Sequence, residues 1–202
     1  MAQTWRASTY AVALAVTLLA WCPVVPAAAA PPEIFVKSMA VNAIDVLSDR
    51  NMPAEQRRER FGNLIRQAFD APAIARSVLA AKWATATPEQ QARFLRVYER
   101  ALIQIYTDRF FDYDGHSLQV VGSQAQADGM TLVRSTVATP TGSNTYNVDW
   151  IVSPLNGGQR FFDVVIDGIS TNQTTRQDYM AVLLASGGDL DRLIALLEAK
   201  TP

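Results

Sequence analysis

The chain has 202 residues and a formal net charge of −1, and 49% of its residues are hydrophobic. This near-neutral balance lacks the basic surplus with which proteins attract nucleic acids or anionic membrane surfaces. With one cysteine, Cys22, and one histidine, His116, the chain offers little material for disulfides, a thiol nucleophile or a histidine-based metal site.

Residues 1–30 have the pattern of a cleaved secretory signal peptide. Arg6 is their single charged side chain, and the apolar run over residues 11–21 is shorter than the roughly 20 residues of a membrane-spanning helix. The bulky tryptophan before Cys22 disfavours a lipoprotein, in which that cysteine would carry acyl chains. We therefore predict export to the periplasm and a single mature domain over residues 31–202.

The first half of the mature chain has helical periodicity. Apolar residues recur three and four positions apart over residues 34–47 and again over residues 61–69. Asp70 is expected to cap a short helix. Thr87 opens the motif Thr-Pro-Glu-Gln, a capping box with proline at the first helical position, which predicts a long helix that ends near Phe111.

The hydrophobic period then changes to two. Four strands are predicted, at residues 117–123, 130–139, 145–153 and 159–167. The third is the clearest, because Tyr146, Val148 and Trp150 alternate with polar neighbours, and short connections favour antiparallel pairing. Two closing helices, at residues 176–186 and 189–200, complete an α+β domain. In it a curved four-stranded antiparallel sheet is wrapped by about six helices.

Motifs for chemistry are scarce. The sequence contains no P-loop, dinucleotide-binding, zinc-protease or serine-hydrolase motif. Residues 112–116, Asp-Tyr-Asp-Gly-His, bring two carboxylates and an imidazole together, but they lack the further ligands that calcium or zinc needs, so we interpret them as a helix-to-strand turn. Asp149 is expected on the polar face of its strand. We predict no catalytic residue, no metal and no cofactor.

Aromatic side chains gather on the predicted apolar faces of both halves. A filled core would produce the same pattern, since core and cavity wall share one composition. The pattern by itself favours the filled core, but an exported domain without cysteines or catalytic motifs raises the alternative of an apolar cavity between the curved sheet and the long helices. Two alternatives stay open: an interaction module with a filled core, and an enzyme with Asp163 as general base and Tyr106 or Tyr146 as acid.

From Phe69 onward the sequence resembles the periplasmic phospholipid-binding proteins of the Mla lipid-transport pathway, also called the toluene-tolerance family. Leu79 and Trp83 occupy the positions of the family's L-G-x-x-W motif, and Asp163 begins a segment similar to D-V-x-x-x-G-V-S. The resemblance extends over the mature chain, and further matches follow in the same order: Phe94, Tyr106, Tyr113, Gly115, Arg176, Tyr179, and Gly188 to Ile194.

The resemblance implies an NTF2-like half-cone that holds phospholipid tails inside and the head group at its rim. It further implies a monomeric carrier that moves lipid between an outer-membrane lipoprotein complex and an inner-membrane ABC transporter. The lipid is then the cargo and not a cofactor. The residues then expected to contact lipid are Leu79, Trp83, Tyr106, Phe110, Tyr146, Val148, Trp150, Val164, Ile166, Ile169, Tyr179 and Leu183.

The sequence departs from the family pattern at several positions. Ala80 replaces the motif glycine, Thr171 and Asn172 replace a hydrophobic pair, and Thr175 replaces a tyrosine. These extra polar groups near the expected rim leave the cargo open. A polycyclic lipid, as in the family branch associated with hopanoid biosynthesis, is the alternative to a phospholipid.

Overall fold

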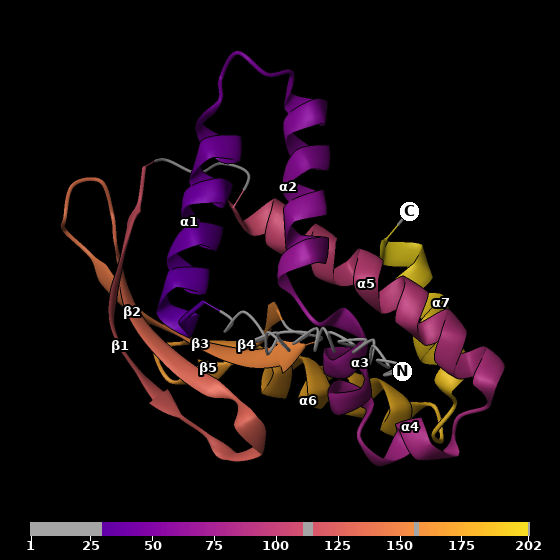
Figure 1. The fold of residues 1–202 in the computed structure, drawn as a ribbon. Helices are drawn as coiled ribbons and strands as arrows, with labels where there is room; N and C mark the ends of the chain where they lie inside the picture. The colour runs from indigo at the N-terminus through magenta and orange to yellow at the C-terminus, as the bar shows by residue number, and fades with distance from the viewer. Residues whose placement is uncertain (1–29, 111–114, 156–157, 202) are drawn as a thin grey trace, which may run out of the picture.

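Helices come first along the chain, an antiparallel meander follows, and two helices close it (Figure 1). The computed structural model describes residues 30–110, 115–155 and 158–201, so the predicted signal peptide lies outside it except for Ala30. The helices are α1 (Pro32–Ser48), α2 (Ala54–Ala68), α3 (Ala71–Leu79), α4 (Ala81–Thr85), α5 (Pro88–Phe110), α6 (Thr171–Ala185) and α7 (Leu190–Lys200). The strands are β1 (Ser117–Ala125), β2 (Thr131–Ala138), β3 (Thr145–Leu155), β4 (Gly158–Ile166) and β5 (Ile169–Ser170).

The sheet follows the order β1-β2-β3-β4-β5, and every neighbouring pair is antiparallel. Its register shifts between Val120 and Gly122 in β1, and again where β3 meets β4. Such bulges increase the twist and bend the strands, which curves the sheet. The sequence predicted four strands; β5 was missed because two residues are too short to show a period.

The helices cover the sheet unequally. In Figure 1, α1 and α2 rise together as a hairpin, α7 lies beside α5, and α6 passes below the sheet near β4 and β5. Both helices of the hairpin contact the sheet, α1 at β1 and β2 and α2 at β4, whereas α3 packs mainly against α5 and α6. One end of the molecule is therefore helix against helix, and the other is a helical hairpin over a curved sheet.

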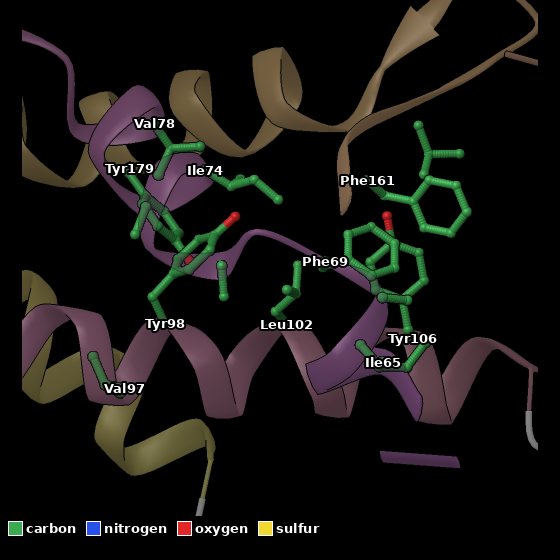
Figure 2. Packing of buried hydrophobic residues seen from close by; sticks show 14 of the residues in the cluster. Ile65, Phe69, Ile74, Val78, Val97, Tyr98, Leu102, Tyr106, Phe161 and Tyr179 are labelled. Atoms are coloured by element: carbon green, nitrogen blue, oxygen red, sulfur yellow. The ribbon is translucent and has the colours of Figure 1, made fainter. Parts of the chain in front are cut away.

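The helical end is a filled core. Side chains from α3, α5 and α7 interlock there, and Figure 2 shows part of this packing around Ile74, Val78 and Val97. Phe94 is completely buried and contacts the ring of Tyr98 at a centroid distance of 5.8 Å. This packing fixes α5 as the rigid element from which the remaining side chains extend toward the sheet.

Local capping motifs fix where the helices begin. The predicted capping box is confirmed: Gln90 N donates to Thr87 Oγ1 at 3.2 Å, and Thr87 N donates to Gln90 Oε1 at 3.1 Å. The predicted cap of α3 is confirmed as well, since Asp70 Oδ1 accepts from Ala73 N at 3.1 Å. Both motifs satisfy amide groups that the first turn of a helix leaves without partners.

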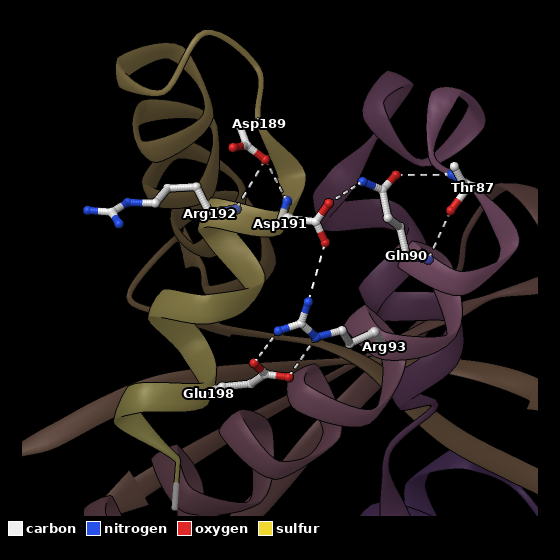
Figure 3. A network of polar contacts seen from close by, with 7 residues as sticks. All are labelled: Thr87, Gln90, Arg93, Asp189, Asp191, Arg192 and Glu198. Atoms are coloured by element: carbon white, nitrogen blue, oxygen red, sulfur yellow. Dashed lines mark hydrogen bonds and ion pairs between the residues drawn. The ribbon is translucent and has the colours of Figure 1, made fainter.

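The capping box also takes part in fastening α7 to α5 (Figure 3). Gln90 donates to Asp191 at 2.8 Å, and Arg93 donates to both oxygens of Glu198, at 2.9 and 2.6 Å. The hydrogen bond from Arg93 lowers the pKa of the Glu198 carboxyl. The two-pronged geometry sets the position of α7 more than it adds stability, because the pair is partly exposed to water.

The start of α6 differs from the prediction. The helix begins at Thr171 rather than Arg176, because Ser170 caps it by accepting from Gln173 N at 2.9 Å. The intervening segment, Thr-Asn-Gln-Thr-Thr, has no apolar periodicity, so its helical state follows from capping and not from a hydrophobic face. As a consequence, several hydroxyl groups lie on the first turns of α6.

Ala80 has a backbone conformation that suits glycine, with φ of 50° and ψ of −127°. We expect Ala80→Gly to raise the free energy of unfolding by about 1 kcal/mol, because relief of strain exceeds the greater freedom of glycine in the unfolded chain. Chemical denaturation measures the change. The matched control is Ala92→Gly in the exposed interior of α5, which should lower stability by about 1 kcal/mol; equal losses in both variants would contradict strain at Ala80.

Candidate functional site

A cavity of about 580 Å³ lies between the helical hairpin and the curved sheet. The sheet contributes side chains that alternate along its strands, and α1, α2 and α5 contribute the opposite wall. The residues that line it are Met39, Ala40, Ala43, Ile44, Leu47, Phe61, Leu64, Ile65, Ala68, Phe69, Tyr106, Phe110, His116, Ser117, Leu118, Val137, Tyr146, Val148, Trp150, Val164 and Ile166. Among these described residues no side chain carries a permanent charge, so the cavity suits an apolar ligand.

Polar groups of this cavity gather where the end of α5 meets the start of β1 and β3. His116 and Ser117 lie there beside Phe110 and Tyr146, whose side chains are 39% and 40% exposed. An aromatic ring that lines a cavity and also meets solvent marks an opening. The cavity therefore communicates with water at this end, while its walls elsewhere are aliphatic and aromatic.

A buried hydrogen-bond chain holds the central wall of the cavity in place. Trp150 Nε1 donates to Ser135 Oγ at 2.9 Å, and Ser135 Oγ donates to the carbonyl oxygen of Val148 at 2.6 Å. Trp150 also contacts the ring of Phe161 at a centroid distance of 4.8 Å. The indole N–H is thus satisfied by the protein, and the apolar face of Trp150 is available to a ligand.

A second cavity of about 450 Å³ adjoins the first. The two share Phe69, Tyr106 and Ile166, and the rings of Phe69 and Tyr106 are 4.7 Å apart. The second cavity is more polar at its edge, and its remaining lining is Ile74, Tyr98, Leu102, Ile105, Asp167, Ile169, Thr171, Asn172, Thr174, Thr175 and Tyr179. A ligand that fills the first cavity could extend past the shared residues into the second.

Asp163 lies outside the described lining of both cavities. Its side chain is buried and accepts hydrogen bonds from Val164 N, Ser170 Oγ, Thr171 Oγ1 and Asn172 N, at distances between 2.5 and 3.1 Å. The carboxylate is therefore committed to the β4–α6 connection. This geometry does not match a general base that must reach a substrate proton.

Metal binding has little support in the part of the chain that the structure describes. No group of three or more histidine, cysteine, aspartate or glutamate side chains gathers there as a metal ion would require. Asp112 and Asp114, the carboxylates of the turn considered in the sequence, lie outside the described residues.

Among the helices of the described segments, none is long and apolar enough to cross a membrane.

Comparison with known proteins identifies the family. The model of the MlaC protein family matches residues 37–199. This chain belongs to the MlaC family. It is 25% identical over 185 residues to the toluene tolerance protein Ttg2D of Pseudomonas putida, a match that covers 88% of this chain and 84% of the relative.

A solved structure shares the fold. The phospholipid-binding protein from Ralstonia solanacearum, determined in complex with a phospholipid, superposes with a TM-score of 0.73 at 21% identity. The match covers 85% of this chain and 97% of that one. The α+β class and the resemblance to the toluene-tolerance family, both predicted from the sequence, are confirmed; the hopanoid-associated branch stays a prediction.

Most residues predicted to contact lipid in this MlaC-family chain line one of the two cavities. The first cavity receives Tyr106, Phe110, Tyr146, Val148, Trp150, Val164 and Ile166, and the second adds Ile169 and Tyr179. Whether they bind lipid stays a prediction. What the structure establishes is that residues distant in sequence converge on two cavities that share Phe69, Tyr106 and Ile166 in their lining.

Three residues predicted to contact lipid lie outside the described lining of both cavities. Leu79 is fully buried in the helical core and Leu183 is 5% exposed, while Trp83 is half-buried with the guanidinium of Arg76 6.0 Å from its ring. Their positions in the family-like motif therefore reflect helix packing. We interpret this packing as what holds the α3–α4 turn, where Ala80 has a positive φ, and not as contact with a ligand.

The sequence interpretation missed the helical wall of the cavity. Side chains of α1 and α2, such as Ile44, Leu47, Phe61 and Ile65, line it throughout. Their spacing correctly predicted apolar helix faces, and that spacing was the available signal. A helix face looks the same whether it covers a core or a cavity, so the assignment had to wait for the structure.

Proposed function

We propose that this protein is a periplasmic carrier that shields the acyl chains of a phospholipid from water. The observation that carries the proposal is the cavity between the α1–α2 hairpin and the sheet, with its almost wholly apolar lining. Each methylene group moved from water into such a space contributes about 0.8 kcal/mol. Such a cavity would keep the acyl chains of a lipid out of water while the carrier crosses an aqueous compartment.

The named relatives support the same reading. One is a toluene tolerance protein and another was solved with a bound phospholipid. We extend this to a shuttle, acting as a monomer, between an outer-membrane lipoprotein complex and an inner-membrane ABC transporter complex. A carrier in that role must leave the membrane after loading, and a formal net charge of −1 gives no broad attraction to anionic bilayers. A hopanoid-type lipid is the alternative cargo for the same cavity.

Lipid analysis of the purified protein tests the proposal. Protein exported by a bacterial host should carry lipid in a defined stoichiometry, detected by native mass spectrometry and identified after organic extraction. Protein that is folded but empty, and that stays empty when incubated with phospholipid vesicles, would contradict a carrier. The identity of the extracted lipid separates phospholipid from polycyclic cargo.

A transfer assay tests the shuttle. The protein should accelerate movement of labelled phospholipid from donor to acceptor vesicles in proportion to its concentration. In flotation the loaded protein should stay mostly in the soluble fraction. Tight, salt-resistant flotation would indicate a protein that resides on the membrane instead.

A further inference from the structure

Two buried tyrosines that line the second cavity contact each other edge to face. Tyr98 on α5 is 3% exposed and Tyr179 on α6 is 9% exposed, and their rings are nearly perpendicular, with centroids 6.3 Å apart (Figure 2). Both line the cavity, and no residue in the described segments forms a hydrogen bond with either hydroxyl. Neither oxygen is among the fully buried unpartnered polar atoms of the described segments, so both hydroxyls open onto the cavity and are available to a ligand.

The two phenols can act only as neutral groups. Burial raises the pKa of Tyr98 well above its ordinary value, and burial likewise raises the pKa of Tyr179. Both therefore keep their protons at any physiological pH and can donate hydrogen bonds. A suitable partner is a ligand group that accepts hydrogen bonds and has no donor hydrogen.

The edge of the second cavity is poor in donors. The hydroxyls of Thr171, Thr174 and Thr175 already donate to Asp163 or to backbone carbonyls, and the amide of Asn172 donates to a carbonyl of β4. Among the described lining residues Asp167 alone is charged, and its charge is negative. A phosphate group would find no cation there, which favours an uncharged acceptor deep in the cavity.

We propose that the second cavity binds the ester carbonyls of a diacyl lipid through the hydroxyls of Tyr98 and Tyr179. The proposal rests on the carrier function and adds an orientation. Acyl chains would fill the first cavity and pass Phe69 and Tyr106. The glycerol esters would then meet the two phenols, and the head group would emerge beside Ile169, which is 66% exposed. A diacyl lipid presents two ester carbonyls, which matches two donors.

Ester and ether lipids of one head group and chain length test this. Delipidated wild-type protein should bind a diester phosphatidylethanolamine about 5–10-fold more tightly than the diether analogue, which lacks both carbonyls. In the Tyr98→Phe/Tyr179→Phe variant the preference should vanish, because diester affinity falls while diether affinity stays unchanged. Thr107→Val is the matched control, since it removes a buried hydroxyl from α5 outside the described lining of both cavities and should keep the preference.

The outcomes separate this proposal from the carrier function. If wild type binds neither lipid, the carrier function fails. If wild type binds both equally, or the double variant keeps the preference, the ester site is overturned. A second measurement is independent of any variant: the infrared band of ¹³C-labelled ester carbonyls in the wild-type complex should have the lowered frequency of a hydrogen-bonded carbonyl, and a band at the frequency of free esters would overturn the site.

Discussion

The Val148→Trp variant is expected to lose most of its bound lipid, while the delipidated variant stays about as stable as delipidated wild type. Val148 is central in the sheet, where it pairs with Ser135 of β2 and Ile166 of β4, and its side chain lines the first cavity between Tyr146 and Trp150. An indole at this position enters space that acyl chains would occupy. Thermal melts of delipidated samples and lipid-to-protein ratios measure the two effects.

Val133→Trp is the matched control for this experiment. Val133 is fully buried on β2, pairs with Trp150 and lies outside the described lining of both cavities. A tryptophan there overpacks closed structure and should lower the free energy of unfolding by about 1–3 kcal/mol or more. If Val148→Trp instead melts as low as this control and keeps its lipid, Val148 belongs to ordinary core and the cavity is misplaced.

Features encoded by neighbouring residues could be predicted from the sequence. The capping box at Thr87 and the cap at Asp70 each join atoms three residues apart, so the local pattern contains the whole interaction. The alternation around Val148 likewise placed the cavity-facing side of β3. These elements are the ones for which the sequence prediction and the structure agree.

The boundary between core and cavity could not be predicted in this way. Leu79 and Ile44 are both apolar residues on helix faces, yet one packs in the helical core and the other lines the first cavity. The difference is the distance between packed elements, which depends on the curvature of the sheet and on how α1 and α2 lean over it. No local pattern in the chain records that distance.

The family-like motif from Asp163 to Ser170 is explained by the structure as a folding unit. Asp167 and Gly168 turn the chain at positive φ, and Ser170 then returns to donate a hydrogen bond to Asp163. The same Ser170 caps α6. The motif therefore joins the sheet to α6, the helix that carries Tyr179. Its acidic residue, Asp163, stabilises this connection and does not line the second cavity.

Replacement of Asp163 by alanine should be the most destabilising single change at this connection. Loss of the carboxylate removes an acceptor from the buried amide of Val164 and the part-buried amide of Asn172, and two hydroxyl groups lose theirs. We expect the free energy of unfolding to fall by about 3 kcal/mol or more. Equilibrium urea denaturation, monitored by tryptophan fluorescence, measures the loss.

Asp70→Ala provides the matched comparison, because the Asp70 carboxylate also accepts a backbone hydrogen bond at the start of a helix, from Ala73, but is only half-buried. Its replacement should cost about 1 kcal/mol. A much larger loss for Asp163→Ala than for Asp70→Ala is what a buried structural carboxylate requires. Equal and small losses would mean that Asp163 is dispensable for folding. The general-base interpretation of Asp163 would then return, since a catalytic carboxylate can be removed without loss of the fold.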